Sequence, residues 1–149
     1  MESAMDALPH YYTVAASGNN STSHVVVSSS GVSDIVTDAP AEFGGPGDQW
    51  SPEALMMAAV ADCFILTFRA IARASKLDWQ ALTVEATGTL DRVDRKTQFT
   101  DIGLSVAVTV IGDVSEQQVE RLLHKAEEGC LITNSLNAAI SLEFAVAYA

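Results

Sequence analysis

The chain has few basic residues and few cysteines, and each shortage excludes a class of protein. Only eight of its 149 residues are Lys or Arg, against nineteen Asp and Glu, so the formal net charge is −11. Binding to nucleic acid or to an anionic membrane needs clustered basic side chains, and we therefore expect neither partner. Two cysteines are too few for a secreted disulfide scaffold.

Disorder and a second domain are excluded in the same way. Hydrophobic residues make up 48% of the chain and charged residues 18%, which leaves ample apolar surface to bury. The length predicts a single domain over 1–149, with residues 1–10 flexible. The beginning of the chain lacks the basic region of a signal peptide. The most apolar stretch, 54–71, is interrupted by Asp62 and Arg69, so we expect a cytoplasmic protein without a membrane span.

The N-terminal third predicts a small antiparallel meander. Its apolar runs are rich in Val and Tyr and are separated by Gly, Ser and Asn, which favour turns. The predicted strands are Tyr11–Ala16, His24–Ser28 and Val32–Thr37. Three glycines and two prolines then predict a loop over 38–50.

A long helix follows with clear start signals. Ser51 suits the N-cap, Pro52 the first helical position, and Glu53 places negative charge against the helix dipole. From Ala54 to Ala74 most residues are apolar helix formers on nearly every side, and such a helix has to be buried all round. Because so small a chain cannot surround it, we expect a second copy to cover the exposed side.

The next segment alternates between apolar and polar residues, which is typical of strands with one buried face. The alternation covers 82–90 and 102–110, and the polar stretch 91–97 connects them. The sequence therefore predicts a long hairpin.

A second helix and a closing strand complete the chain. Ser115 and Gln118 form a capping box, and Gly129 is expected to stop the helix in the left-handed conformation. The run 140–148 alternates again and predicts a last strand. The predicted order along the chain is strands, a helix, two strands, a helix and a strand. This order is an α+β pattern and not a series of repeated βαβ units.

Two cysteines are the main candidates for chemistry. Cys63 lies within the long helix and Cys130 follows the second helix. They are either small buried hydrophobic residues or a dithiol pair brought together when the two helices pack. The three histidines have no ligand spacing, and the glycine-rich run 44–47 lacks a phosphate-binding fingerprint, so we predict no metal and no cofactor.

Two segments resemble the cysteine motifs of the OsmC/Ohr family, the osmotically inducible and organic hydroperoxide resistance proteins. The first consists of Ser51–Leu55 and Ala58–Phe64, which contains Cys63. The second is 126–136, with the residues Ala-Glu-Glu-Gly-Cys-Leu-Ile-Thr-Asn-Ser-Leu. The resemblance implies an α+β OsmC-like fold, with antiparallel sheets packed around a long central helix in an intertwined homodimer.

The resemblance also implies a thiol-dependent peroxidase. Cys63 would be the peroxidatic cysteine, attacking a small organic hydroperoxide and becoming a sulfenic acid. Cys130 would resolve it to a disulfide, and a dithiol reductant, lipoyl-type in part of the family, would reopen that bond. The apolar neighbours are expected to suit a fatty or aromatic peroxide; they are Met56, Met57, Phe64 and Phe68.

One departure from the family concerns the cation that ionises the peroxidatic thiol. In the family's peroxidases an Arg from the N-terminal half supplies it, paired with the Glu that matches Glu53. This chain has no Lys or Arg before Arg69. Glu53 precedes Cys63 by about 15 Å of helix. The Glu53 carboxylate can therefore reach the Cys63 sulfur only if the helix breaks or if the Glu53 comes from the other subunit. Arg69 is the first candidate replacement, and its alternative is a surface or interface ion pair; the others are Arg73, Arg92 and Arg95.

The missing Arg keeps other functions open. An OsmC-fold redox-sensing or hydrophobic-ligand-binding protein would retain the cysteines with little peroxidase turnover. A purely structural dimer with inert cysteines is the third alternative.

Overall fold

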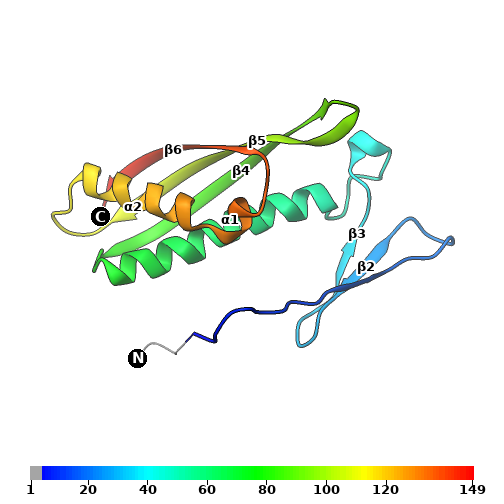
Figure 1. Ribbon diagram of the computed structural model, residues 1–149, viewed down its shortest axis with the longest axis horizontal. Coiled ribbons are helices and arrows are strands. Elements are labelled where there is room, and N and C mark those ends of the chain that lie inside the picture. Colours follow the sequence, from blue (N-terminus) through cyan, green and yellow to red (C-terminus); the bar gives the residue numbers. More distant parts are fainter. Residues whose placement is uncertain (1–4) are drawn as a thin grey trace. The chain divides into compact units, whose positions relative to one another are not determined.

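The computed structural model describes residues 5–149, and the chain falls into two compact units. The N-terminal unit is Met1–Leu55 and the C-terminal unit is Met56–Ala149. Figure 1 shows their elements along the chain. The flexibility expected of residues 1–10 falls partly on 1–4, which lie outside the described residues; residues 5–10 form no helix or strand.

The N-terminal unit contains the predicted meander. Strands β1 (Ala15–Ser17), β2 (Val25–Ser28) and β3 (Ile35–Thr37) pair antiparallel in chain order. Each is shorter than predicted, but the arrangement is confirmed. The following loop contains one 3₁₀ turn, η1 (Ala41–Phe43), and a bridge joins Thr37 to Trp50.

The long helix, α1, runs from Pro52 to Ala74. Its predicted N-cap is confirmed, because the Ser51 hydroxyl accepts a hydrogen bond of 3.1 Å from the Ala54 backbone N–H. The four buried residues of α1 recur at every fourth position, which is one face of a helix; they are Val60, Phe64, Phe68 and Ala72. The rest of this apolar helix is half-buried or exposed within one chain.

By length and composition alone, α1 is apolar enough to cross a membrane, and only 17% of its most apolar stretch is buried. The expectation that Asp62 and Arg69 exclude a span on composition was therefore wrong. The central helix of a soluble protein passes the same test, so the finding is weak support for a membrane span.

In the C-terminal unit the hairpin is longer than the alternation predicted. Strand β4 covers Trp79–Val93 and strand β5 covers Lys96–Val110, paired antiparallel. The stretch 91–97 is thus mostly strand, contrary to the prediction of a long connection. Only Asp94 and Arg95 lie in the turn, both with positive φ, which a tight two-residue hairpin turn requires.

Helix α2 (Glu116–Gly129) begins with the predicted capping box. Ser115 accepts a hydrogen bond from the Gln118 backbone N–H, and the Gln118 side chain accepts one from the Ser115 backbone N–H. The prediction for Gly129 was wrong: it is the last helical residue and does not have positive φ. Cys130 ends the helix with extended backbone instead, at φ −71° and ψ 107°, and the short helix α3 (Leu131–Asn134) follows.

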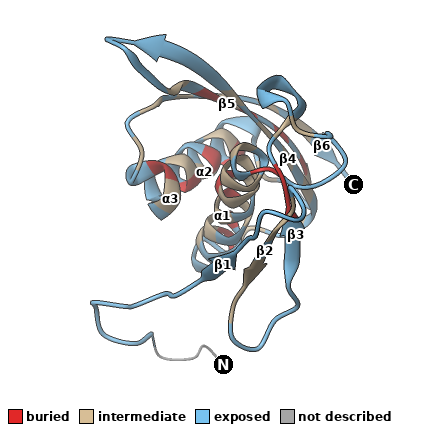
Figure 2. Ribbon diagram, turned by 90° about the vertical axis from the view of Figure 1, so that its right-hand side faces the viewer, coloured by how far each residue is buried: buried red, intermediate tan, exposed pale blue. Residues whose placement is uncertain are grey.

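The last strand, β6 (Ala139–Tyr148), corrects the expectation of purely antiparallel sheets. It pairs parallel with β5, because the chain returns through α2 before it re-enters the sheet. The sheet order is β4-β5-β6. The two longer helices cover one face of this sheet (Figures 1 and 2), so the unit has two layers and the α+β class is confirmed. The alternate residues of β5 from Ile102 to Val110 are buried beneath the helices.

Candidate active site

Cys63 lies in the middle of α1, next to its buried stripe and partly open to solvent. One helical turn further on, the Thr67 hydroxyl lies 3.9 Å from the Cys63 sulfur. Residues four apart on a helix share a face, so this contact follows from the spacing alone. Cys63 is therefore accessible and has a polar partner.

Cys130 occupies the junction between α2 and α3 and is only 1% exposed. Its backbone carbonyl accepts hydrogen bonds from the Thr133 hydroxyl, at 3.1 Å, and from the Asn134 N–H, at 3.0 Å. These two bonds form the single turn of α3 that follows Cys130. Cys130 is thus held in place by the residues that follow it in the second motif.

The Cys130 thiol has a pKa below its ordinary value, although burial acts in the opposite direction. Desolvation raises the pKa, and the hydrogen bonds that outweigh it come from the Thr133 backbone and side chain, the Cys63 side chain and the Ile132 backbone. Hydrogen bonds to a thiolate favour the ionised form. The Cys63 side chain is one of the groups that act on the Cys130 pKa, so the structure brings these two free cysteines close together.

Thr67 and Gly129 form a second contact between the same two segments. A Cβ atom added to Gly129 would lie 3.4 Å from the Thr67 methyl group. Because Gly129 directly precedes Cys130, the absence of a side chain there lets the end of α2 approach α1 closely. This packing explains the glycine better than a left-handed helix stop.

The predicted carboxylate, Glu53, lies in the first turn of α1. Among the residues that the structure describes, its buried oxygen Oε1 has no hydrogen-bond partner. The helix between Glu53 and Cys63 is unbroken, which separates the two by about 15 Å at 1.5 Å per residue. The structure therefore does not bring Glu53 to the cysteine of its own helix.

The candidate cations are spread over several elements. Arg69 is exposed on α1, six residues after Cys63, which places it on a different face of the helix. Arg73 lies in the last turn of α1, Arg92 in β4 and Arg95 in the hairpin turn. The groups that lower the Cys130 pKa act on it through hydrogen bonds, and none of these groups is a cation.

The predicted apolar substrate cleft needs a correction. Phe64 and Phe68 are completely buried in the core, where Phe68 packs edge-to-face on Trp79 with ring centroids 5.6 Å apart. They support the fold and do not face an accessible substrate. Met56 and Met57 are half-buried.

A family profile described as OsmC-like protein matches residues 45–145, more than half of the chain. The chain belongs to the OsmC family. Both cysteine motifs lie inside the matched region, which confirms the membership that the motifs indicated.

Named OsmC relatives include proteins of unknown function and hydroperoxide resistance proteins. Uncharacterized protein YmaD of Bacillus subtilis is 27% identical over 107 residues, 70% of this chain and 71% of that protein. An OsmC-like protein of unknown function from Vibrio cholerae is 22% identical with a TM-score of 0.85, covering 92% of this chain and 100% of that one. An organic hydroperoxide resistance protein from Elizabethkingia anophelis is 21% identical with a TM-score of 0.74, covering 95% of this chain and 100% of that one. The solved structures show that the OsmC fold is shared.

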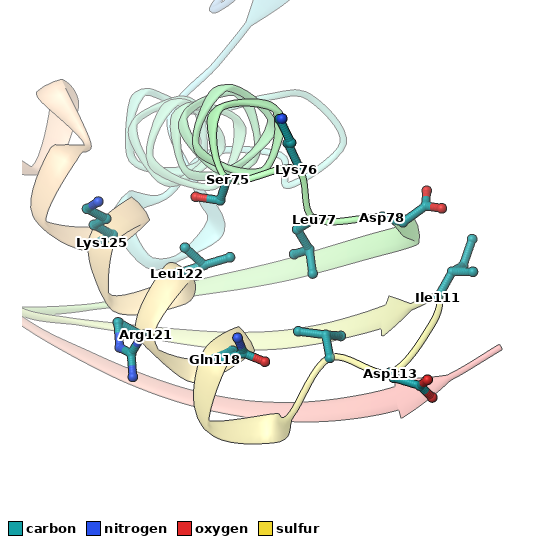
Figure 3. Close-up of a pocket in the computed structure, with 11 residues that line it drawn as sticks. Ser75, Lys76, Leu77, Asp78, Ile111, Asp113, Gln118, Arg121, Leu122 and Lys125 are labelled. Carbon is teal, nitrogen blue, oxygen red and sulfur yellow. The ribbon is translucent and has the colours of Figure 1, made fainter.

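A separate cavity of about 560 Å³ opens between the end of α1 and the start of α2 (Figure 3). Leu77, Val114 and Leu122 line it, with Arg121 and Lys125 on its α2 side and Asp78 and Asp113 toward the opposite end. Neither cysteine of the OsmC motifs lines it. It is therefore distinct from the thiol pair.

Sequence reasoning missed Thr67 and Thr133, the hydroxyl partners of the two cysteines. The spacing from Cys63 to Thr67 was a usable signal, since residues four apart face the same way on a helix. For Thr133 no comparable signal exists, because its contact depends on the short turn of α3.

Proposed function

We propose that this OsmC-family protein is a thiol-dependent peroxidase that reduces organic hydroperoxides to alcohols. The observation that carries the proposal is the proximity of Cys63 and Cys130, which lie far apart in sequence. Thr67 contacts the Cys63 sulfur and lies against Gly129, the residue before Cys130, and the Cys63 side chain acts on the Cys130 pKa. The organic hydroperoxide resistance proteins that share the fold support the choice of substrate class.

The difference in burial between the two cysteines supports the proposed division of roles. Cys63 is partly accessible and Cys130 is buried, so a peroxide meets Cys63 first. The Cys63 thiolate attacks one oxygen of the O–O bond; that bond breaks, the alkoxide takes a proton and leaves as the alcohol, and Cys63 becomes a sulfenic acid. Cys130 then attacks the Cys63 sulfur, forming a disulfide and releasing water.

The lowered pKa of Cys130 suits the second step, since the thiolate is the attacking species. In this proposal hydrogen bonds from Thr133 and Ile132 favour the Cys130 thiolate without a neighbouring cation. Glu53 and Arg69 remain proposed members of the site. A small dithiol, lipoyl-type as in part of the family, would return the disulfide to two thiols.

The setting of the proposed enzyme is a cytoplasmic homodimer. The exposed apolar surface of α1 supports a second copy, since large apolar surfaces of soluble proteins mark interaction sites. No cofactor is needed, because both redox groups are side chains of this chain.

A redox-sensing or hydrophobic-ligand-binding role is the second candidate, favoured by the exposed position of Arg69. Stopped-flow oxidation of the reduced protein separates the two. The peroxidase proposal expects rapid loss of two thiols with cumene hydroperoxide and much slower loss with hydrogen peroxide. Slow and equal reaction with both oxidants would favour the second candidate.

Substitution of each cysteine tests the assigned roles. Cys63→Ser should lower peroxidase turnover by at least about a thousandfold, because the nucleophile is gone. Cys130→Ser should consume one equivalent of peroxide and stop as a sulfenic acid that dimedone traps, measured by intact mass spectrometry. Full activity in Cys63→Ser, or dimedone labelling on a residue other than Cys63, would contradict the assignment.

A further inference from the structure

Thr67 touches both halves of the thiol pair through the two branches of its side chain. Its hydroxyl lies 3.9 Å from the Cys63 sulfur. Its methyl group faces Gly129, at 3.4 Å from where a Cβ atom would be. One side chain therefore contacts the sulfur of the first cysteine and the residue that precedes the second.

The two contacts of Thr67 cannot change independently. A β-branched side chain has few χ1 rotamers, and one rotation moves the hydroxyl and the methyl group together. The chosen rotamer directs the hydroxyl to Cys63 and, at the same time, fixes how closely the end of α2 packs on α1. One torsion angle of Thr67 thus places both the group that contacts the Cys63 sulfur and the group that lies against Gly129.

Gly129 supports the same interpretation. Gly129 is the last residue of α2 and does not have positive φ. The conformation therefore does not require glycine at this position. A side chain at this position would come into van der Waals contact with the Thr67 methyl group.

We propose that Thr67 is a positioning residue that sets the geometry at which Cys63 and Cys130 form their disulfide. This deepens the proposed function and rests on it, since the disulfide is the intermediate of the proposed cycle. The hydroxyl orients the Cys63 sulfur, and the methyl group acts as the spacer against which Gly129 holds Cys130.

Diamide oxidation tests the geometry without any peroxide. The two thiols lose two protons and two electrons to the N=N bond of diamide, which becomes the hydrazine, and a disulfide forms. The rate of intramolecular disulfide formation in the reduced full-length protein is followed by mass spectrometry of quenched samples. Thr67→Val keeps the shape and removes the hydroxyl, and should slow the reaction about tenfold.

Thr67→Ser keeps the hydroxyl and removes the methyl group. It should retain more of the wild-type rate than Thr67→Val, a rescue that a purely space-filling role would not give. Thr83→Val, the same exchange at an exposed position of β4, is the matched control and should leave the rate unchanged. Equal rates for wild type and Thr67→Val, at equal thermal midpoints, would overturn the proposal, as would a Thr67→Ser rate as low as that of Thr67→Val.

Gly129→Ala tests the spacer directly. The added methyl group comes into direct contact with the Thr67 methyl group. It should slow disulfide formation in the wild type, but less in Thr67→Ser, where the opposing methyl group is absent. Equal slowing in both backgrounds would contradict the contact. If the wild type forms the disulfide with diamide but does not react with cumene hydroperoxide, the proposed peroxidase fails while the diamide comparison still decides the role of Thr67.

Discussion

Asp38 is a buried carboxylate at the end of β3 and gathers several donors of the N-terminal unit. Its Oδ2 accepts hydrogen bonds from the Ser23 hydroxyl, at 2.5 Å, and from His24 Nδ1, at 3.0 Å, while Oδ1 accepts one of 2.7 Å from the Ala39 N–H. The Ser23 bond is the largest cause of a lowered Asp38 pKa; desolvation opposes it, and Ala39 and His24 add to the lowering. Asp38 thereby joins the residues just before β2 to the start of the loop after β3.

The lowered pKa predicts the pH dependence of that junction. A carboxyl group with a lower pKa in the folded state stabilises the fold above its unfolded pKa, about 4, and loses that contribution as the pH falls through the folded pKa. Asp38→Asn should therefore lower the urea midpoint at pH 6 and have a shrinking effect toward pH 3. Asp34→Asn, in the exposed turn before β3, is the control. An Asp38→Asn effect that stays constant between pH 6 and pH 3 would contradict this role.

Among the elements, the β4–β5 hairpin has an unusual turn. Asp94 has φ 50° and Arg95 has φ 69°, and neither residue is glycine. Positive φ at both central positions matches the twist of a two-residue hairpin, but it is unfavourable for a side chain as long as that of Arg. The hairpin thus forms despite its turn sequence, because the long strands and the helices packed on them fix it.

Arg95→Gly should raise the free energy of unfolding by about 0.5–1 kcal/mol, since glycine adopts positive φ without a steric penalty. Urea denaturation measures the change. Arg92→Gly is the matched control: Arg92 lies in β4 opposite Thr97, where glycine should lower stability by a similar amount. Destabilisation by both substitutions would show that the turn is not strained at Arg95.

At the scale of the whole molecule, α1 has more apolar surface than one chain covers. Its buried stripe serves the core of the C-terminal unit, while Leu66 on another face is 50% exposed. The charged residues of α1 balance, two acidic and two basic, so the helix adds nothing to the net charge of −11. The proposed homodimer would bury this surface.

Leu66→Glu should convert the proposed dimer into a monomer, because a charge at the centre of an apolar interface loses its hydration without a partner. Light scattering after size exclusion gives the mass, which is 15.8 kDa for one chain. Glu116→Gln at the exposed start of α2 is the control and should leave the mass of the wild type unchanged. A wild-type protein that runs at 15.8 kDa at micromolar concentration would contradict the dimer.

Local signals in the sequence determined most of the elements. Period-two alternation predicted β4, β5 and β6, and capping residues predicted where α1 and α2 begin, because these patterns depend on neighbours within a few residues. The two cysteine motifs identified the family for the same reason. Neighbouring residues were enough for all of these predictions.

Only the tertiary structure decided what depends on contacts between distant segments. The parallel pairing of β6 with β5, the packing of Gly129 on Thr67 and the lowered pKa of Cys130 each arise where two elements meet. The residue types are compatible with several sets of contacts between distant segments, and the free energy of packing the whole unit selects one set. The sequence therefore determined that the chain has two cysteines in OsmC-type motifs, and the fold determined that the two lie close together.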